Sequence, residues 1–180
     1  AKGKKIKRPQ EGKLEPLKCS MLPLDYEITE DSDIRIIQIA GANAQYYRML
    51  WTHNFVGSQA TYNRAVLIDG YVAAVFGISK MAADSIFVWY VMKAPHKLYR
   101  LGRLCYMLAQ NQIFVDTLLD DIDQEKVTKM RTAMLTKYAE NKEVRGIMKL
   151  VNRQEDAKNG YKLTYEAALV AGRDEKATLA

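Results

Sequence analysis

The segment from Arg64 to Ile78 constrains the fold more strongly than any other part of the chain. Its two apolar stretches, residues 64–68 and 71–78, flank the dipeptide Asp69-Gly70. Asp-Gly readily adopts the positive φ angles of a tight two-residue turn, so the segment predicts a β-hairpin. Residues 85–92 follow as a nearly continuous apolar and aromatic stretch. Such a stretch is typical of a strand that is covered on both faces of a sheet.

The residues before this hairpin predict a strand and a helix. Residues 33–39 are rich in β-branched side chains and roughly alternate, which indicates a short strand. Gly41 interrupts this pattern, and Asn43 is expected to cap a helix over residues 44–51. Residues 54–63 contain Gly and Ser and predict a loop.

The residues after the hairpin change to a helical period beyond Pro95. Mostly apolar side chains then fall at three- and four-residue intervals up to Asp116, at Leu101, Leu104, Cys105, Leu108, Gln112 and Val115. Residues 129–136 predict a strand, and Asn141 is expected to cap a helix whose apolar face contains Val144, Ile147, Met148 and Val151. Asn159-Gly160 then turns the chain into a last strand over residues 161–167.

This order of elements predicts an α/β fold, a single-domain mixed β-sheet flanked by helices. A chain of 180 residues suits one domain, with 48% hydrophobic and 27% charged residues. We expect a basic flexible arm over residues 1–20, the domain over residues 21–170 and a polar tail over residues 171–180. No apolar run is long enough to span a membrane, and Cys19 and Cys105 are too few for a disulfide framework. A cytoplasmic location with no membrane partner is therefore expected.

The net charge of +6 favours an anionic partner such as nucleic acid or a phosphorylated cofactor. Residues 1–18 hold seven Lys and Arg against two Glu. This arm is either a solvated tail or a segment that binds the phosphates of DNA. If it binds DNA, the expected contacts are Lys4, Lys5, Lys7 and Arg8.

A second group of basic residues joins the third strand to its helix. It contains Lys93, His96, Lys97, Arg100 and Arg103. The start of a helix offers unpaired N–H groups and a partial positive charge, and at Gly102 a ligand can approach the backbone closely. The group predicts an anion pocket, with a basic solvated loop as the alternative. Lys142 and Arg145, at the expected helix start near Asn141, form a similar but separate candidate whose charges surface basicity explains equally well.

The acidic stretch from Asp116 to Gln124 could suggest a site for a divalent metal ion. Its carboxylates, Asp116, Asp120, Asp121 and Asp123, lack the spacing, the central Gly and the terminal Glu of an EF-hand loop. We therefore expect a solvated helix end and loop, and no metal.

The hairpin, the long apolar strand, the basic turn and the elements after it together resemble the GCN5-related N-acetyltransferase superfamily. Residues 99–104, Tyr-Arg-Leu-Gly-Arg-Leu, are similar to the loop that holds the coenzyme A pyrophosphate in that superfamily. The match is incomplete, because Leu104 stands where the family's pattern has a second small residue. The resemblance implies acetyl-CoA or a related coenzyme A thioester as cofactor, bound by Val91, Met92, Lys93, His96, Lys97, Arg100, Leu101, Gly102 and Arg103.

A narrower resemblance concerns residues 51–54, Trp-Thr-His-Asn, together with the hairpin and residues 75–77, Val-Phe-Gly. These pieces are similar to the Mom-type phage DNA-modification proteins, a branch of the same superfamily that alters adenine in DNA. This implies an acyltransferase-like enzyme that modifies a base in DNA. His53 would then be the catalytic base, with Asn54 and Tyr90 as substrate contacts, although a locally bonded His53 and a core Tyr90 remain alternatives.

Two other functions remain open at this point. One is an N-acyltransferase that acts on a small-molecule or protein amine. The other is a basic nucleic-acid-binding module without catalysis, in which the arm and the two basic helix starts contact phosphates.

Overall fold

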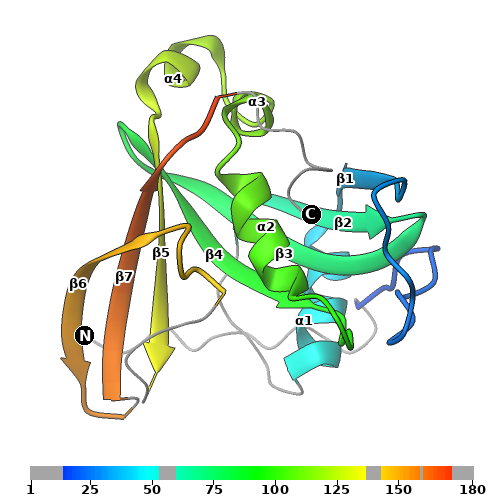
Figure 1. Ribbon diagram of the computed structural model, residues 1–180. Coiled ribbons are helices and arrows are strands. Elements are labelled where there is room, and N and C mark those ends of the chain that lie inside the picture. Colours follow the sequence, from blue (N-terminus) through cyan, green and yellow to red (C-terminus); the bar gives the residue numbers. More distant parts are fainter. Residues whose placement is uncertain (1–13, 53–59, 137–142, 159, 172–180) are drawn as a thin grey trace.

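The computed structural model describes residues 14–52, 60–136, 143–158 and 160–171. Along these residues the chain forms seven strands and four helices (Figure 1). They are β1 (Ile34–Gln38), α1 (Gly41–Thr52), β2 (Tyr62–Ile68), β3 (Tyr71–Ala82), β4 (Ser85–Lys93), α2 (Leu101–Ala109), α3 (Gln112–Asp116), α4 (Asp121–Lys126), β5 (Lys129–Thr136), β6 (Lys149–Asp156) and β7 (Gly160–Ala168).

All seven strands belong to one sheet in the order β1-β2-β3-β4-β5-β7-β6. Neighbouring strands are antiparallel except β4 and β5, which are parallel. Helix α2 packs on one face of the sheet, and α1 packs on the other face, against β2, β3 and β4 (Figure 1). The prediction of a mixed sheet flanked by helices is confirmed.

Successive side chains of the hairpin point to opposite faces of the sheet and so belong to two separate parts of the core. Val66, Ile68 and Phe76 belong to the core under α2, whereas Ala65 and Leu67 belong to the core under α1. Side chains of a strand alternate between faces, so a hairpin that is apolar at successive positions is buried on both. The predicted turn is confirmed as well, with a φ of 48° at Asp69 and 82° at Gly70.

Strands β4 and β5 are paired over only part of their length. Residues 85–88 of β4 pair with residues 129–132 of β5. Beyond that point β4 continues to Lys93 without pairing to β5, while β5 continues to Thr136 along β7. Figure 1 shows the two strands diverging below their paired ends. Residues 89–93 of β4 are therefore unpaired on the side of β5, and we call this interruption of the sheet the opening.

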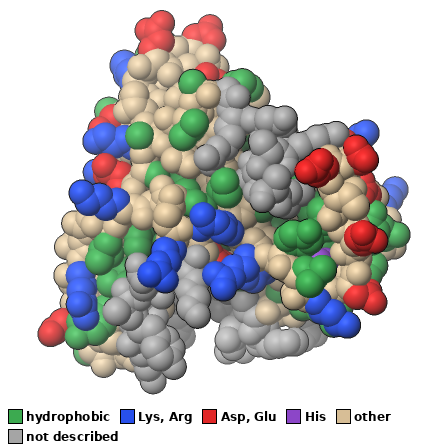
Figure 2. Space-filling model, in the orientation of Figure 1, with side chains coloured by type: hydrophobic (Ala, Val, Ile, Leu, Met, Phe, Trp, Pro, Cys, Tyr) green, Lys and Arg blue, Asp and Glu red, His purple; other side chains and the backbone are tan. Residues whose placement is uncertain are grey.

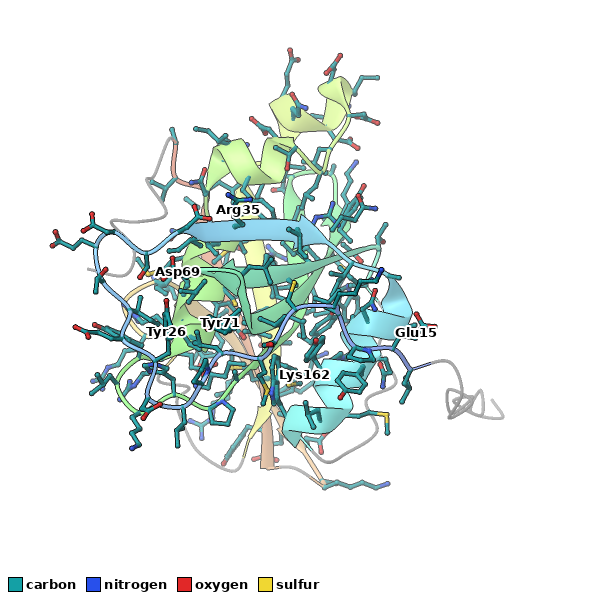
Figure 3. The ribbon with its side chains drawn as sticks, turned by 90° about the vertical axis from the view of Figure 1, so that its right-hand side faces the viewer. Glu15, Tyr26, Arg35, Asp69, Tyr71 and Lys162 are labelled. Carbon is teal, nitrogen blue, oxygen red and sulfur yellow. The ribbon has the colours of Figure 1, made fainter. Side chains whose placement is uncertain are left out.

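The N-terminal segment crosses the hairpin and is fixed at its turn. The Tyr26 hydroxyl donates to Asp69 Oδ2 at 2.7 Å, and the rings of Tyr26 and Tyr71 have centroids 5.1 Å apart. Figure 3 shows these three residues close together where the segment passes the β2–β3 turn. The segment contacts the domain before residue 21, since the Leu17 N–H donates to the Tyr47 hydroxyl at 3.0 Å.

The helix expected from Asn141 is wrong. Residues 143–147 form a turn and residues 149–156 form β6, which pairs with β7 at the edge of the sheet. Gly146 has a φ of +78°, which interrupts a helix, and Val151 is 50% exposed. The helical spacing of the apolar residues was therefore accidental, because pairing with a distant strand decides the structure here. Asn141 itself lies outside the described residues.

The helix predicted to run as far as Asp116 is interrupted after Ala109. Asn111 accepts hydrogen bonds from the N–H groups of Ile113 and Phe114 and caps a separate helix, α3. Asp120 caps α4 in the same way, where we expected a helix end and a loop.

Two boundaries near α1 also differ from expectation. The helix begins at Gly41, so Asn43 lies in its first turn and accepts a hydrogen bond from the Ala40 N–H at 3.2 Å. Residues 62 and 63, expected in a loop, begin β2, while residues 54–59 of that loop lie outside the described part of the chain. No helix in the described part of the chain is long and apolar enough to cross a bilayer.

Candidate functional site

An irregularity in β4 shapes the edge that faces the opening. Tyr90 lies opposite Gly77 of β3 and Val88 lies opposite Ile78, which leaves Trp89 as an extra residue. Such a bulge bends the strand and changes which face its side chains occupy. Val88 accordingly belongs to the core under α2, whereas Tyr90 belongs to the core under α1.

Beyond the bulge, β4 directs backbone N–H groups into the opening. The N–H of Ala94, the next residue after β4, donates to the Ala73 carbonyl at 2.8 Å, on the β3 side. Successive N–H groups of a strand point to alternate edges, so those of Val91 and Lys93 point toward the opening. Met92, the residue between them, packs against the core under α1. Of the predicted cofactor contacts in β4, Val91 and Lys93 therefore have their N–H groups on the side of the opening, whereas the Met92 N–H points toward β3.

The start of α2 lies beside this edge. Arg100 is its N-cap and makes no side-chain capping hydrogen bond. The first N–H groups of a helix have no partner within the helix, and they carry a partial positive charge. Leu101 and Gly102 are buried here, whereas Arg100 is exposed. The start of α2 therefore offers backbone donors and a partial positive charge that favour an anion.

The turn before β6 contributes a second set of residues to the same place. The Lys93 ammonium is ion-paired with the Glu143 carboxylate, and Arg103 Nη1 donates to the Arg145 carbonyl. A Cβ atom on Gly102 would lie 2.6 Å from the Glu143 carboxylate carbon and from both of its oxygens. Figure 2 shows Lys and Arg side chains gathered between the lower half of α2 and this turn. Arg103 of the first basic group thus contacts the backbone of Arg145, a member of the second group that the sequence suggested as a separate candidate.

His96 shapes the loop between β4 and α2. Its Nδ1 accepts hydrogen bonds from the N–H groups of Leu98 and Tyr99, both at 3.2 Å, so the ring proton is assigned to Nε2. Nε2 lies 2.8 Å from the Tyr26 carbonyl and donates to it. A phosphate contact by His96 would have to replace one of these bonds. Lys97 lies on the same loop and is exposed.

Tyr90 lies in a buried polar cluster on the α1 side of the sheet. Its hydroxyl donates to Asn63 Oδ1 at 2.6 Å, and the guanidinium carbon of Arg48 is 3.8 Å from the centre of its ring. Tyr90 is 5% exposed and Arg48 is 2% exposed. Burial raises the pKa of Tyr90, although the nearby Arg48 cation opposes the shift. The phenol is therefore neutral, and its role as a substrate contact stays a prediction.

Glu143, Arg48 and Asn63 did not emerge from the sequence. Arg48 follows the buried Ala44 by four residues and so lies on the buried stripe of α1, which is the available signal. Glu143 and Asn63 contact Lys93 and Tyr90, which are distant in the sequence, so no local sequence pattern indicates their roles. His53, Asn54, Lys4, Lys5, Lys7, Arg8 and Lys142 lie outside the described residues.

Cys105 is not a candidate nucleophile. It is fully buried in α2, and burial raises the pKa of its thiol, with the Glu143 carboxylate adding to the shift. Reactive cysteines have a lowered pKa and access to solvent.

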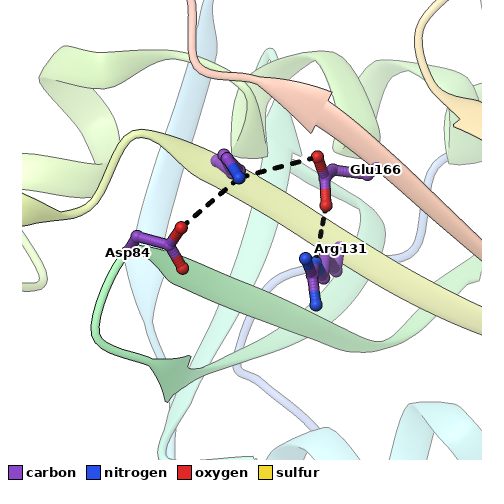
Figure 4. Close-up of polar contacts among 4 residues, drawn as sticks. Asp84, Arg131 and Glu166 are labelled. Atoms are coloured by element: carbon purple, nitrogen blue, oxygen red, sulfur yellow. Dashed lines mark hydrogen bonds and ion pairs between the residues drawn. The ribbon is translucent and has the colours of Figure 1, made fainter. Parts of the chain in front are cut away.

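A group of charged residues joins the strands around the paired part of β4 and β5. Lys129 Nζ is 3.3 Å from Asp84 Oδ2 and 3.9 Å from Glu166 Oε1, and Arg131 Nε is 2.7 Å from Glu166 Oε2 (Figure 4). These contacts join β5 to β7 and to the turn before β4. Of the acidic stretch, Asp123 pairs with Lys80 at 2.5 Å. The described part of the chain holds no group of three or more acidic, His or Cys residues suited to a metal ion.

Comparisons with known proteins identify this arrangement. The sequence profile of the phage GNAT-like domain family matches residues 31–180. No curated protein sequence matches the chain.

Among solved structures, the chain is similar to Ard1 from Thermoplasma volcanium, with a TM-score of 0.51 and 10% identity over 76% of this chain and 98% of that one. It is also similar to a GNAT-family acetyltransferase from Bacillus cereus ATCC 10987, with a TM-score of 0.51 and 7% identity over 77% of this chain and 99% of that one. The IAA acetyltransferase from Bacillus cereus ATCC 14579 gives a TM-score of 0.50 and 10% identity over 76% of this chain and all of that one. At these identities the likeness concerns the fold.

Proposed function

The chain belongs to the phage GNAT-like family, and from this premise we propose that it is an acyltransferase that uses a coenzyme A thioester. The observation that carries the proposal is the opening between β4 and β5, which lies directly beside the basic start of α2. A linear ligand with a carbonyl at one end and phosphates at the other matches that arrangement.

The described residues fit such a cofactor at both ends. The N–H groups of Val91 and Lys93 point into the opening and can donate to a thioester carbonyl. The N–H groups of Leu101 and Gly102, with Lys93, Arg100 and Arg103 around them, can bind a pyrophosphate. The Glu143 carboxylate already lies against Gly102, so this place accepts an anion. When bound, the thioester supplies an activated acyl group, and the chain's own residues bind it, orient it and polarise its carbonyl.

A base in DNA is our first proposal for the acceptor. It rests on the net charge of +6, on the basic arm with Lys4, Lys5, Lys7 and Arg8, and on the resemblance to Mom-type proteins. His53 is the proposed base that takes the proton from the attacking amine, with Asn54 and Tyr90 as substrate contacts. An amine of a small molecule or protein is the second proposal, favoured by the acetyltransferase fold itself.

Cofactor binding can be tested by calorimetric titration of the protein with coenzyme A. We expect Arg100→Ala to weaken binding about tenfold, because a hydrogen bond to a charged group contributes about 1.5 kcal/mol or more. Lys126→Ala, at the far end of α4, is the matched control and should leave binding unchanged. If coenzyme A binds neither the unaltered protein nor the control, the proposed cofactor is wrong.

The acceptor can be identified by incubating the protein with acetyl-CoA and duplex DNA, followed by nucleoside mass spectrometry. A modified nucleoside that is lost in His53→Ala supports the first proposal. Unmodified DNA, together with acyl transfer to a panel of small-molecule and peptide amines, supports the second. DNA binding that weakens steeply with salt, without coenzyme A binding or transfer, would instead indicate a non-catalytic module.

A further inference from the structure

The carboxylate of Glu143 lies against Gly102, the second residue of α2. A Cβ atom on Gly102 would meet all three carboxylate atoms at 2.6 Å, so the group lies directly over the glycine. The same carboxylate is paired with Lys93, the last residue of β4. A carboxylate that belongs to the protein thus pairs with the Lys93 ammonium and lies next to the first turn of α2.

This contact exists because Gly102 has no side chain. A carboxylate at a helix start is stabilised by the partial positive charge there, as a phosphate would be. Arg100, the N-cap, supplies no acceptor of its own to this helix start. Glu143 is 22% exposed at its side chain, and its backbone lies in a turn rather than in a helix or strand. The side chain can therefore leave the site by rotating about its own bonds.

We propose that Glu143 is a specificity-determining residue that occupies the phosphate subsite until a more highly charged ligand displaces it. The proposal rests on the proposed function and adds to it the selection of the ligand. A pyrophosphate carries more charge than one carboxylate, and it competes for Lys93 and for the N–H groups at the start of α2. A ligand without phosphates leaves Glu143 in place and gains nothing from these donors.

Displacement lowers the affinity for the phosphorylated ligand. The ligand has to replace a partly exposed ion pair and a carboxylate–helix contact, each of which is a small stabilisation. Together these contacts correspond to about a two- to thirtyfold loss of affinity. Glu143→Gln keeps the shape of the side chain and removes its charge, so the variant should recover that factor.

The experiment compares the unaltered protein, Glu143→Gln and the control Glu166→Gln. Glu166 is also half-buried and paired with cations, but it lies in the β5–β7 ion pairs away from α2. Dissociation constants are measured for coenzyme A by calorimetry, and for inorganic pyrophosphate and acetyl-pantetheine by thermal shift. Acetyl-pantetheine has the thioester without the pyrophosphate. Circular dichroism confirms that each variant is folded.

We expect Glu143→Gln to bind coenzyme A and pyrophosphate about two- to thirtyfold more tightly, with no change for acetyl-pantetheine and no change in the control. Coenzyme A binding that is equal in all three proteins would overturn the role of Glu143 and leave the proposed function intact. If coenzyme A binds none of them while pyrophosphate binds Glu143→Gln more tightly, the proposed cofactor fails and the role of Glu143 stands. An equal gain for acetyl-pantetheine, or no binding of any ligand, would overturn the inference.

Discussion

Replacing Gly77 with Ala tests whether the bulge of β4 is as tightly packed as the structure indicates. A Cβ atom at this position would lie 2.6 Å from the Ala60 Cβ and 2.9 Å from Cδ1 of the Tyr90 ring, and closer still to its Cε1. The ring cannot easily retreat. Its hydroxyl is bonded to Asn63, and the Arg48 guanidinium covers it at 3.8 Å.

The expected cost follows from these contacts. Forcing an extra methyl group into a packed core costs about 1–3 kcal/mol. For a chain of this size, 1 kcal/mol lowers the melting temperature by about 2–4 °C. Gly77→Ala should therefore lower it by about 2–12 °C. Gly41→Ala is the matched control, because a Cβ atom on Gly41 meets nothing within 4 Å.

The assay is thermal unfolding followed by circular dichroism, with Tyr90→Leu as a second change in a double-mutant cycle. Relief of the clash by Tyr90→Leu in the Gly77→Ala background should appear as a coupling of about 0.5–3 kcal/mol. A loss in Gly77→Ala no larger than that in Gly41→Ala, or additive effects in the cycle, would refute the packing described at the bulge.

Three further outcomes are expected. Asn111→Ala removes the acceptor that caps α3 and should reduce the free energy of unfolding by about 1 kcal/mol in chemical denaturation, whereas an unchanged midpoint would contradict the capping role. The melting temperature should fall as the pH rises above 9.0, the ordinary pKa of a thiol. Folding raises the pKa of Cys105 and so favours its protonated form, which means that this contribution to stability is present below pH 9.0 and is lost as the pH rises above it. Cys105→Ala should therefore make the fall in melting temperature above pH 9.0 less steep. An identical fall in the variant would contradict the raised pKa of Cys105. Glu166→Gln should change the free energy of unfolding by less than about 1 kcal/mol, because its ion pairs with Lys129 and Arg131 are partly exposed; a larger loss would show that they are stronger than such pairs usually are.

The parts of the fold that were predicted from the sequence are those in which local chemistry and burial agree. Asp69-Gly70 fixes the hairpin through its own backbone preferences, and residues 85–92 are apolar because β4 is covered on both faces. The strand over residues 129–136 and the last strand were found for similar reasons. In these segments the local preference and the tertiary structure favour the same result.

The prediction failed where a distant partner decides the structure. Residues 149–156 are mostly exposed and form a strand because β7 offers a free edge, which no periodicity within the segment reveals. The break between α2 and α3 depends on the Asn111 side chain, since the apolar spacing continues through it. The basic residues of the candidate site were recognisable by type, whereas Glu143 became visible only once the turn before β6 was placed against α2.

The parallel pairing of β4 and β5 explains why the site residues meet. In a sheet with parallel strands, ligands bind beyond the carboxyl ends, where the connections leave in different directions. The connection from β4 leads to α2 and brings Lys93, Gly102 and Arg103, while the connection from β5 leads to β6 and brings Glu143 and Arg145. Both connections begin at the same end of the sheet. Residues more than 40 positions apart in the sequence therefore lie in contact at the proposed anion site, and Glu143, the proposed competitor, comes with the second connection.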